Sequence, residues 1–370
     1  MMLLALACGG APAGPTPAPI AAQPATSVFE AGRTAYGFYP SPPEVSLESI
    51  MGHFQALGQH ADFVLVQQNL PWEDFAAGVE GDSQKRTDMR NLMTLARQNG
   101  LEAVFVADAL NGLNRREFIG LPAGWEANFA NPQVRAAFTN FTLWLVREFQ
   151  PRYLGLASEI NTYADAYPED FPNYLSLYRE VYALVKAEAP ETQIFVTFQW
   201  EDLNNMFPTA AEGRAAYATN WEQVEAFEPE LDMWVISSYP FFIFPSGAEI
   251  PANYYTPLLT RTRKPLAVAE GGFTSKPLGE SGVKGTPQDQ VDYLNAIQTQ
   301  LGQRLAFWVY LLLNDFNPDS YGPVMATQGM DDDDQNTLGF FASVGLREFD
   351  GTPKPALAVW DSFRAEAATP

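Results

Sequence analysis

The sequence contains few of the residues on which common catalytic and metal sites depend. Among its 370 residues are a single cysteine, Cys8, and two histidines, His53 and His60. One cysteine cannot form a disulfide within the chain. A Ser-His-Asp triad or a histidine-rich zinc site has almost nothing to draw on, because both need imidazole groups. Carboxylates remain as acid and base groups, and we expect neither a metal nor another cofactor.

Basic residues are also scarce. The chain has 22 Lys and Arg against 44 Asp and Glu, which gives a net charge of −22, and the basic residues form no stripe along the sequence. This composition excludes nucleic acid as a partner. Long-range repulsion also disfavours an anionic membrane surface or a polyanionic substrate. Much of the acidity serves solubility, and a neutral substrate fits best.

The first residues are apolar and uncharged. The segment 1–8 resembles a bacterial lipoprotein signal that ends at its lipid-bearing cysteine, here Cys8, although no Lys or Arg precedes it. An accidental likeness is the alternative. The segment 9–28 is rich in Ala, Pro, Gly and Thr, a composition typical of a disordered tether. We therefore predict a secreted or cell-surface bacterial lipoprotein. It would be a monomer whose only membrane contact is its lipid anchor, with a folded body at 29–366.

Eight short apolar segments alternate with helical segments through this body. The strands are predicted at 34–39, 61–67, 101–108, 153–159, 193–200, 231–240, 264–270 and 305–315. Helices are predicted at 44–57, 82–98, 171–187, 221–227, 252–263, 286–301 and 356–365, and Asn131-Pro132 opens one more. Alternation of strands and helices indicates a parallel sheet. Eight such units favour α/β architecture in the form of a single-domain (β/α)8 TIM barrel.

Two of the predicted strands end in glutamate. One runs from Tyr153 to Glu159, and the other runs from Lys264 to Glu270 and is followed by two glycines. The carboxyl ends of parallel strands meet at the edge where barrels perform chemistry. Either glutamate alone is equally well explained as a solvated rim residue. As a pair they suit retaining glycoside hydrolysis, for which we expect the two carboxyl groups to lie about 5–5.5 Å apart.

These motifs resemble those of a known clan. In retaining glycoside hydrolases with (β/α)8 barrels, the acid/base residue ends strand four and the nucleophile ends strand seven. The sequence Ser237-Ser-Tyr-Pro-Phe on the sixth predicted strand, together with Glu159-Ile and Glu270-Gly, is most similar to the endo-β-1,4-galactanase family. The stretch from Asp350 to Leu357 resembles the ending of many such hydrolases.

The resemblance implies a role for each matching residue. Glu159 would be the general acid and then the general base. Glu270 would attack the anomeric carbon and form a glycosyl-enzyme. Tyr239 would hydrogen-bond Glu270, and Trp308 would lie beneath the sugar at the cleavage subsite.

One position departs from the clan's pattern. The clan has asparagine immediately before the acid/base, where it binds the sugar 2-hydroxyl, whereas this chain has Ser158. Asn161 is the candidate to compensate. Further candidates for substrate binding end other predicted strands at the same mouth: Tyr39, Gln67, Asp108, Gln199, Trp200 and Asp315. Hydrogen bonding within the loops is the alternative role for these residues. Loop aromatics that are candidates for outer sugar subsites are Trp72, Trp125, Tyr163 and Phe242.

Several alternatives remain open at this level. A sugar-binding lipoprotein of a transport system would share the anchor and the aromatic residues, but it would have two lobes. A barrel without catalysis would only capture polysaccharide, and Ser158 supports that reading. A hydrolase of the same clan acting on mannan or glucan fits nearly as well as a galactanase. The acidic run 331–334 suits either a calcium site or, more simply, a solvated surface, because it lacks the alternating ligands of a calcium loop.

Overall fold

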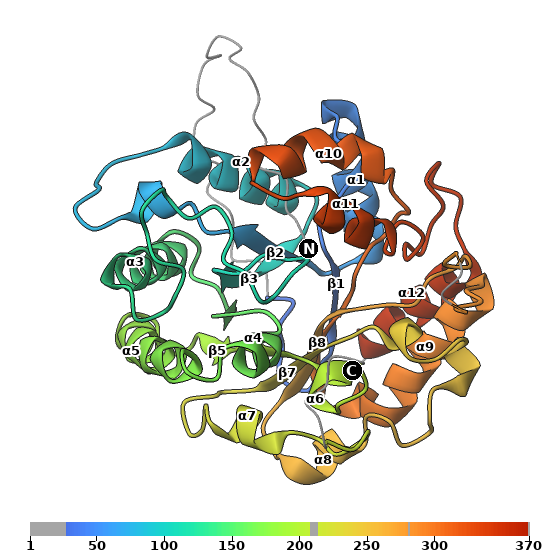
Figure 1. Cartoon of the computed structure of the whole chain (residues 1–370). Coiled ribbons are helices and arrows are strands. Elements are labelled where there is room, and N and C mark those ends of the chain that lie inside the picture. Colours follow the sequence, from blue (N-terminus) through green and yellow to red (C-terminus); the bar gives the residue numbers. More distant parts are fainter. Residues whose placement is uncertain (1–26, 208–213, 280–281, 369–370) are drawn as a thin grey trace.

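The computed structural model describes residues 27–207, 214–279 and 282–368. Its strands are β1 Ala35–Phe38, β2 Phe63–Asn69, β3 Glu102–Asp108, β4 Tyr153–Gly155, β5 Gln193–Phe195, β6 Thr197–Gln199, β7 Trp234–Ser238, β8 Leu266–Gly271 and β9 Leu305–Tyr310. They form one parallel sheet in the order β5-β4-β3-β2-β1-β9-β8-β7-β6. Figure 1 shows the strands at the centre of the molecule with helices around them. The two end strands, β5 and β6, are the halves of the predicted fifth strand, separated by Val196 alone. The sheet is therefore nearly closed, which confirms the (β/α)8 barrel and excludes a two-lobed binding protein.

Helices surround the barrel. They are α1 Leu47–His60, α2 Gln84–Gln98, α3 Pro132–Phe149, α4 Ile160–Ala166, α5 Phe171–Glu188, α6 Trp200–Leu203, α7 Trp221–Glu225, α8 Pro257–Arg261, α9 Pro287–Leu301, α10 Pro318–Thr327, α11 Asp332–Gly339 and α12 Pro355–Ala367. The predicted helices are confirmed, with shifted ends. For example, Ser83 rather than Asp82 caps α2, because its hydroxyl accepts a hydrogen bond from the N–H of Arg86. Helices α4, α6, α10 and α11 were not predicted. None of the helices within the described ranges combines the length and apolarity that a bilayer span needs.

Aromatic side chains fill the barrel interior on the side away from the carboxyl ends of the strands. The rings of Phe63, Tyr153 and Phe195 each lie 5.1–5.8 Å from the ring of Phe307. These residues come from β2, β4, β5 and β9. Most of those strands are not neighbours in the sheet, so the rings meet across the barrel interior. A packed layer of this kind makes the barrel a solid core and leaves only the carboxyl ends of the strands for a site. At β1, Gly37 leaves room for the ring of Phe63, which a Cβ atom would meet at 2.6 Å.

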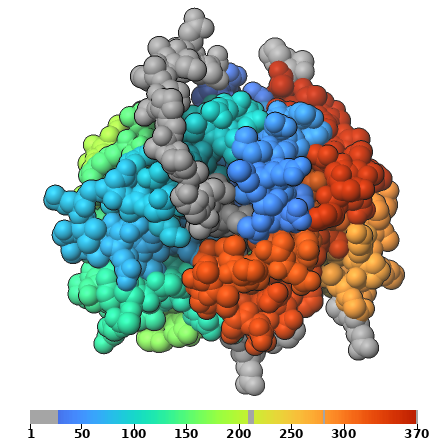
Figure 2. Space-filling view, turned by 90° about the horizontal axis from the view of Figure 1, so that it is seen from above, coloured from blue at the N-terminus to red at the C-terminus, as the bar shows by residue number. Residues whose placement is uncertain are grey.

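Helices α10 and α11 lie in the long connection between β9 and α12. Asp331 caps α11, with its carboxylate accepting from the N–H groups of Asp333 and Asp334. Asp334 in turn accepts from the side chain of Asn111, in the connection after β3. In Figure 2 the orange-red surface of α10 and α11 adjoins the blue-green surface of that connection. The acidic run therefore begins a helix, and within the described residues no group of three or more His, Cys, Asp or Glu side chains is arranged to hold a metal ion.

The amino-terminal end of the described chain lies under the barrel. The N–H of Val28 and the hydroxyl of Ser27 both donate to the carboxylate of Glu102, at the start of β3. Cys8, the predicted signal segment 1–8 and the predicted tether 9–28, apart from these two residues, lie outside the described residues.

Candidate active site

Glu159 lies in the turn between β4 and α4. The strand ends at Gly155, four residues before the predicted end, and Glu159 has a left-handed backbone conformation with φ 52° and ψ 42°. Residues other than glycine rarely adopt this conformation, which costs on the order of 1–3 kcal/mol and is often found at functional sites. The N–H of Glu159 donates to Thr197 at 2.7 Å, and the Ser237 hydroxyl donates to Oε1 of its carboxylate at 2.5 Å.

Glu270 lies on β8, with both of its carboxylate oxygens occupied by tyrosines. The Tyr239 hydroxyl donates to Oε1 at 2.5 Å, and the Tyr39 hydroxyl lies 2.7 Å from Oε2. The pairing of β7 with β8 shifts register between Ile236 and Ser237, so that Ser237 pairs with Glu270. Such irregularities re-aim side chains and are frequent beside active sites. Here the shift occurs where Ser237 reaches Glu159.

Arg115, in the connection between β3 and α3, joins the two glutamates. Its Nε donates to Glu159 at 3.1 Å, its Nη1 to Asp108 at 2.5 Å and its Nη2 to Ser158 at 3.2 Å. Nη2 also lies 4.0 Å from Oε2 of Glu270. The guanidinium side chain is 4% exposed. A planar group with donors on three sides suits this position, because it satisfies several carboxylates in one fixed geometry.

The surroundings of Glu159 and Glu270 shift the pKa values of their carboxyl groups in opposite directions. Burial raises the pKa of Glu159, and the nearby charge of Glu270 adds to this, against the opposing effects of Arg115 and the Ser237 hydrogen bond. Burial also acts to raise the pKa of Glu270, whereas Arg115 and the hydrogen bonds from Tyr239 and Tyr39 act to lower it, and this pKa lies below the usual range. Glu159 therefore keeps its proton to higher pH than Glu270. Pairs of carboxyl groups with opposed shifts are typical of acid and base assignments.

Further buried polar groups support these residues. Gln67 donates to Asp108 at 2.9 Å and lies 2.9 Å from the Tyr39 hydroxyl, which links β1, β2 and β3 at the mouth. Glu201, which is fully buried, accepts from the N–H of Tyr239 at 3.0 Å and from the Ser238 hydroxyl at 2.6 Å. It thereby fixes the backbone that carries the tyrosine bound to Glu270.

The predictions that Trp308 and Trp200 contact the substrate are wrong. Trp308 is fully buried and packs on Trp360 and Phe363 of α12, at ring distances of 5.3 and 6.3 Å. Its neighbour Phe307 points into the barrel, and successive side chains of a strand point to opposite faces. Trp308 therefore faces the helices rather than the mouth. Trp200 is also fully buried, where it packs against Trp221 at 6.1 Å and against tyrosines of the 254–255 segment.

The side chains of Asn161 and Gln199 also form hydrogen bonds with neighbouring segments of the chain. The Asn161 side chain accepts from the Gln199 N–H and donates to its carbonyl and to Asp202, which ties α4 to β6. The Gln199 side chain accepts from the Asp202 N–H and so caps α6. Asn161 therefore does not compensate for Ser158. The Ser158 hydroxyl instead contacts Arg115 and the hydroxyl of Thr197.

The structure thus brings seven of the predicted residues to one place and adds others that the prediction missed. Those brought together are Tyr39, Gln67, Asp108, Ser158, Glu159, Tyr239 and Glu270. Arg115 and Glu201 were missed. Arg115 follows β3 by seven residues in a connection without periodicity, so its only signal is the need for a cation among buried carboxylates.

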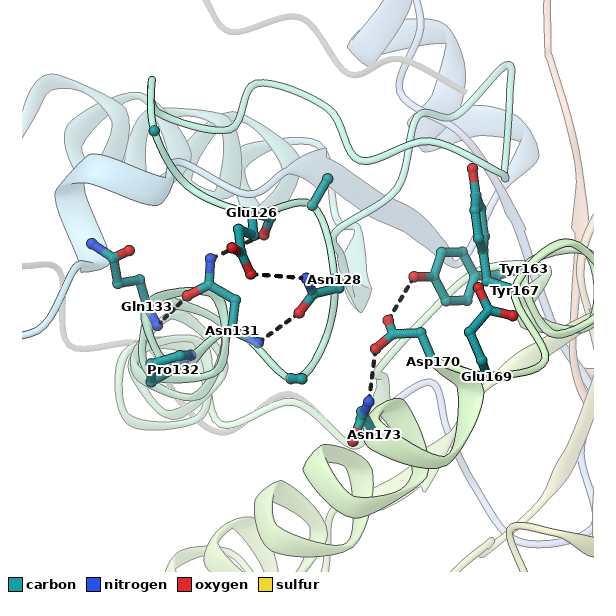
Figure 3. A pocket seen from close by; sticks show the side chains of 13 residues that line it. Glu126, Asn128, Asn131, Pro132, Gln133, Tyr163, Tyr167, Glu169, Asp170 and Asn173 are labelled. Carbon is teal, nitrogen blue, oxygen red and sulfur yellow. Dashed lines mark hydrogen bonds between the residues drawn. The ribbon is translucent and has the colours of Figure 1, made fainter.

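A separate cavity of about 770 Å³ lies between the β3–α3 connection and the turn from α4 to α5. Figure 3 shows its polar lining, with the Tyr163 hydroxyl directed at Asp170. Tyr163 is 1% exposed, so within this cavity Tyr167, at 38%, offers the accessible ring. Neither Glu159 nor Glu270 lines the cavity, which is therefore distinct from the pair of carboxylates.

The comparisons with known proteins find solved structures only. No family model and no curated protein matches the sequence. An exo-β-1,4-mannosidase from Opitutaceae bacterium strain TAV5 aligns over 90% of this chain and 60% of its own, with a TM-score of 0.63 and 13% identity. A GH5_18 protein from Bifidobacterium longum subsp. longum, in complex with Manβ1-4GlcNAc, aligns over 91% and 79%, with a TM-score of 0.62 and 15% identity.

A third similar structure is the GH53 catalytic domain from Ignisphaera aggregans, which aligns over 89% of this chain and 91% of its own, with a TM-score of 0.55 and 13% identity. These neighbours are clan A glycoside hydrolases with TIM barrels. At such identities the likeness establishes the barrel fold. The chain spans 60% of the length of the mannosidase.

Replacing Arg115 tests the charge balance of the site. We expect Arg115→Gln to lower the free energy of unfolding by about 3–5 kcal/mol at neutral pH, because it leaves buried carboxylates without a cation. In the folded variant the pKa values of these carboxyl groups then lie above their values in the unfolded chain. Protonation at lower pH therefore removes the unpaired buried charges, and the loss of unfolding free energy becomes smaller. Urea unfolding at several pH values measures this.

Arg90→Gln is the matched control. Arg90 pairs with Asp82 and Glu148 at the surface, where its side chain is 36% exposed, so water and salt screen the interaction. We expect a much smaller loss than for Arg115→Gln. An Arg115→Gln loss that is equally small, or that does not change with pH, would contradict the assigned charge balance.

Proposed function

We propose that this protein hydrolyses β-glycosidic bonds of a neutral glycan with retention of configuration. One observation carries the proposal. The carboxyl groups of Glu159 and Glu270, from the fourth and seventh strand positions of the barrel, have opposed pKa shifts and are joined by the guanidinium of Arg115. A protonated acid beside an ionised nucleophile is the arrangement that double displacement requires.

Each residue has one task in the proposed reaction. Glu270 attacks the anomeric carbon while Glu159 gives its proton to the glycosidic oxygen, so that the leaving sugar departs as an alcohol. Glu159, now ionised, then takes a proton from water, whose oxygen displaces Glu270. Tyr39 and Tyr239 keep the Glu270 carboxylate oriented through hydrogen bonds at 2.7 and 2.5 Å. The proposal includes the prediction that the two carboxyl groups lie about 5–5.5 Å apart.

The substrate proposed is a β-linked neutral polysaccharide or oligosaccharide. The net charge of −22 disfavours acidic glycans through long-range repulsion. The similar structures include a β-1,4-mannosidase and a GH5_18 protein bound to Manβ1-4GlcNAc, as well as a GH53 domain. They support β-mannosides as well as the β-1,4-galactan that the sequence motifs suggest.

A barrel that binds glycan without cleaving it is the second candidate. The hydrogen bond from Arg115 Nε to Glu159 at 3.1 Å favours it, because a cation at this distance stabilises the ionised form of the proposed acid. The two candidates differ in whether sugar is released.

A panel of β-glycans tests the proposal directly. We expect the protein to release reducing sugar from at least one of β-galactan, mannan, xylan and glucan, with the β-anomer appearing first by proton NMR. Glu159→Gln removes general acid–base catalysis and should lower kcat by about 10²–10⁴-fold on an unactivated glycan. Glu270→Gln removes the nucleophile and should abolish release. Glycan binding without release by the intact protein would support the capture function instead.

The pH profile tests the two roles separately. Ser237→Ala removes a hydrogen bond that lowers the pKa of Glu159, so the alkaline limb of kcat/KM should move to higher pH. Tyr239→Phe removes a hydrogen bond that lowers the pKa of Glu270, so the acid limb should move to higher pH. Each shift should be about one pH unit or less, the size of one hydrogen bond. Movement of the same limb in both variants would overturn the assignment.

We also propose that a lipid on Cys8 holds the protein at the bacterial cell surface. The sequence of segment 1–8 and the absence of charge up to Ser27 support this location. In a bacterial host that processes lipoproteins, the intact protein should sediment with membranes and Cys8→Ser should not. Recovery of the intact protein in the soluble fraction would contradict the proposal.

A further inference from the structure

A pair of exposed phenylalanines stands near the candidate nucleophile. Phe242, in the connection after β7, is 39% exposed, and Phe340, just after α11, is 42% exposed. Their ring centroids are 6.2 Å apart, and Phe341 lies behind them at 5.9 Å from Phe242. These three residues are called the phenylalanine wall. Two adjacent rings exposed to this degree form an apolar patch, which differs from single scattered side chains and often marks a binding surface.

The wall leads inward to Glu270. The Tyr239 ring lies 5.0 Å from Phe341 and 6.2 Å from Phe242, and the Tyr239 hydroxyl donates to Glu270 at 2.5 Å. Tyr239 itself is 3% exposed, so the accessible part of this aromatic path is the wall. The wall is therefore separated from Glu270 by the ring of Tyr239 alone.

The chemistry of the wall selects for an apolar group. Phenylalanine rings carry no hydrogen-bonding atom, whereas Tyr and Trp, the rings with a polar handle, suit surfaces that are partly wet. The hydroxyls of a sugar ring would find no partner among these side chains. The excess of negative charge on the chain also disfavours an anionic amphiphile.

We infer that the phenylalanine wall binds the apolar portion of the substrate, and that the protein accepts neutral amphiphilic β-glycosides such as alkyl or aryl glycosides. The inference rests on the proposed hydrolysis and adds a class of substrate to it. Burying Phe242 and Phe340 against an alkyl chain removes apolar surface of both partners from water, which is the source of the selectivity.

Two glycosides of one sugar test the wall. The methyl and octyl β-glycosides of the sugar that the protein hydrolyses are compared below the concentration at which the octyl compound forms micelles. We expect kcat/KM for the octyl compound to exceed that for the methyl compound by about tenfold or more. Phe242→Ala and Phe340→Ala should each lower this ratio at least about threefold, and the double variant should bring it close to one.

Phe349→Ala is the control, because Phe349 is 47% exposed and belongs to no ring contact with the wall among the described residues. It should keep the octyl-to-methyl ratio of the intact protein. An intact protein with a ratio near one overturns the inference. So does an equal loss for the octyl glycoside and a β-1,4-linked disaccharide in Phe242→Ala, since the wall would then be a platform for sugar rings.

Binding by the phenylalanine wall can also be tested without hydrolysis. If the protein hydrolyses no glycan, calorimetric binding of methyl and octyl β-mannoside to the intact protein and to Phe242→Ala tests the wall alone. Tighter binding of the octyl compound that is lost in Phe242→Ala supports the wall. Equal binding of the two compounds, or no binding, overturns it.

Discussion

One guanidinium among three buried carboxylates is the interaction on which the mouth of this barrel depends. Asp108, Glu159 and Glu270 come from three different strand ends, and Arg115 contacts the first two directly and the third at 4.0 Å. Removing such charges from water costs several kcal/mol each, and the cost is offset only where geometry and hydrogen bonds are good. The hydrogen bonds from Tyr39, Tyr239 and Ser237 complete that balance.

The same arrangement gives the carboxyl groups of Glu159 and Glu270 different pKa values. Glu270 accepts from two tyrosine hydroxyls and remains ionised, whereas Glu159 has one hydroxyl donor and a shared cation in a buried setting. The backbone contributes as well. The left-handed conformation of Glu159 and the register shift at Ser237 bring the Ser237 hydroxyl onto the Glu159 carboxylate. A left-handed turn after β4 and a register shift between β7 and β8 therefore build a site that regular geometry would not form.

The sequence predicted the parts of this protein that follow from periodicity. Alternating strands and helices indicated the barrel, and the glutamates at the ends of two strands indicated the site, because both features are local. Trp308 was misplaced because one residue along a strand reverses the face, and the apolar run 305–313 has no polar residue that would reveal which face is inner. Arg115 and the wall depend on connections whose paths are set by tertiary contacts, such as that of Asn111 with Asp334.

Covalent trapping of Glu270 tests the central claim most directly. A 2-deoxy-2-fluoro β-glycoside with a good leaving group forms the glycosyl-enzyme faster than water removes it. Mass spectrometry of the peptic digest should then show one added fluoroglycosyl group on the peptide that contains Glu270, and no such group in Glu270→Gln. A label on another carboxylate, or sugar release by inversion with no covalent species, would contradict the account.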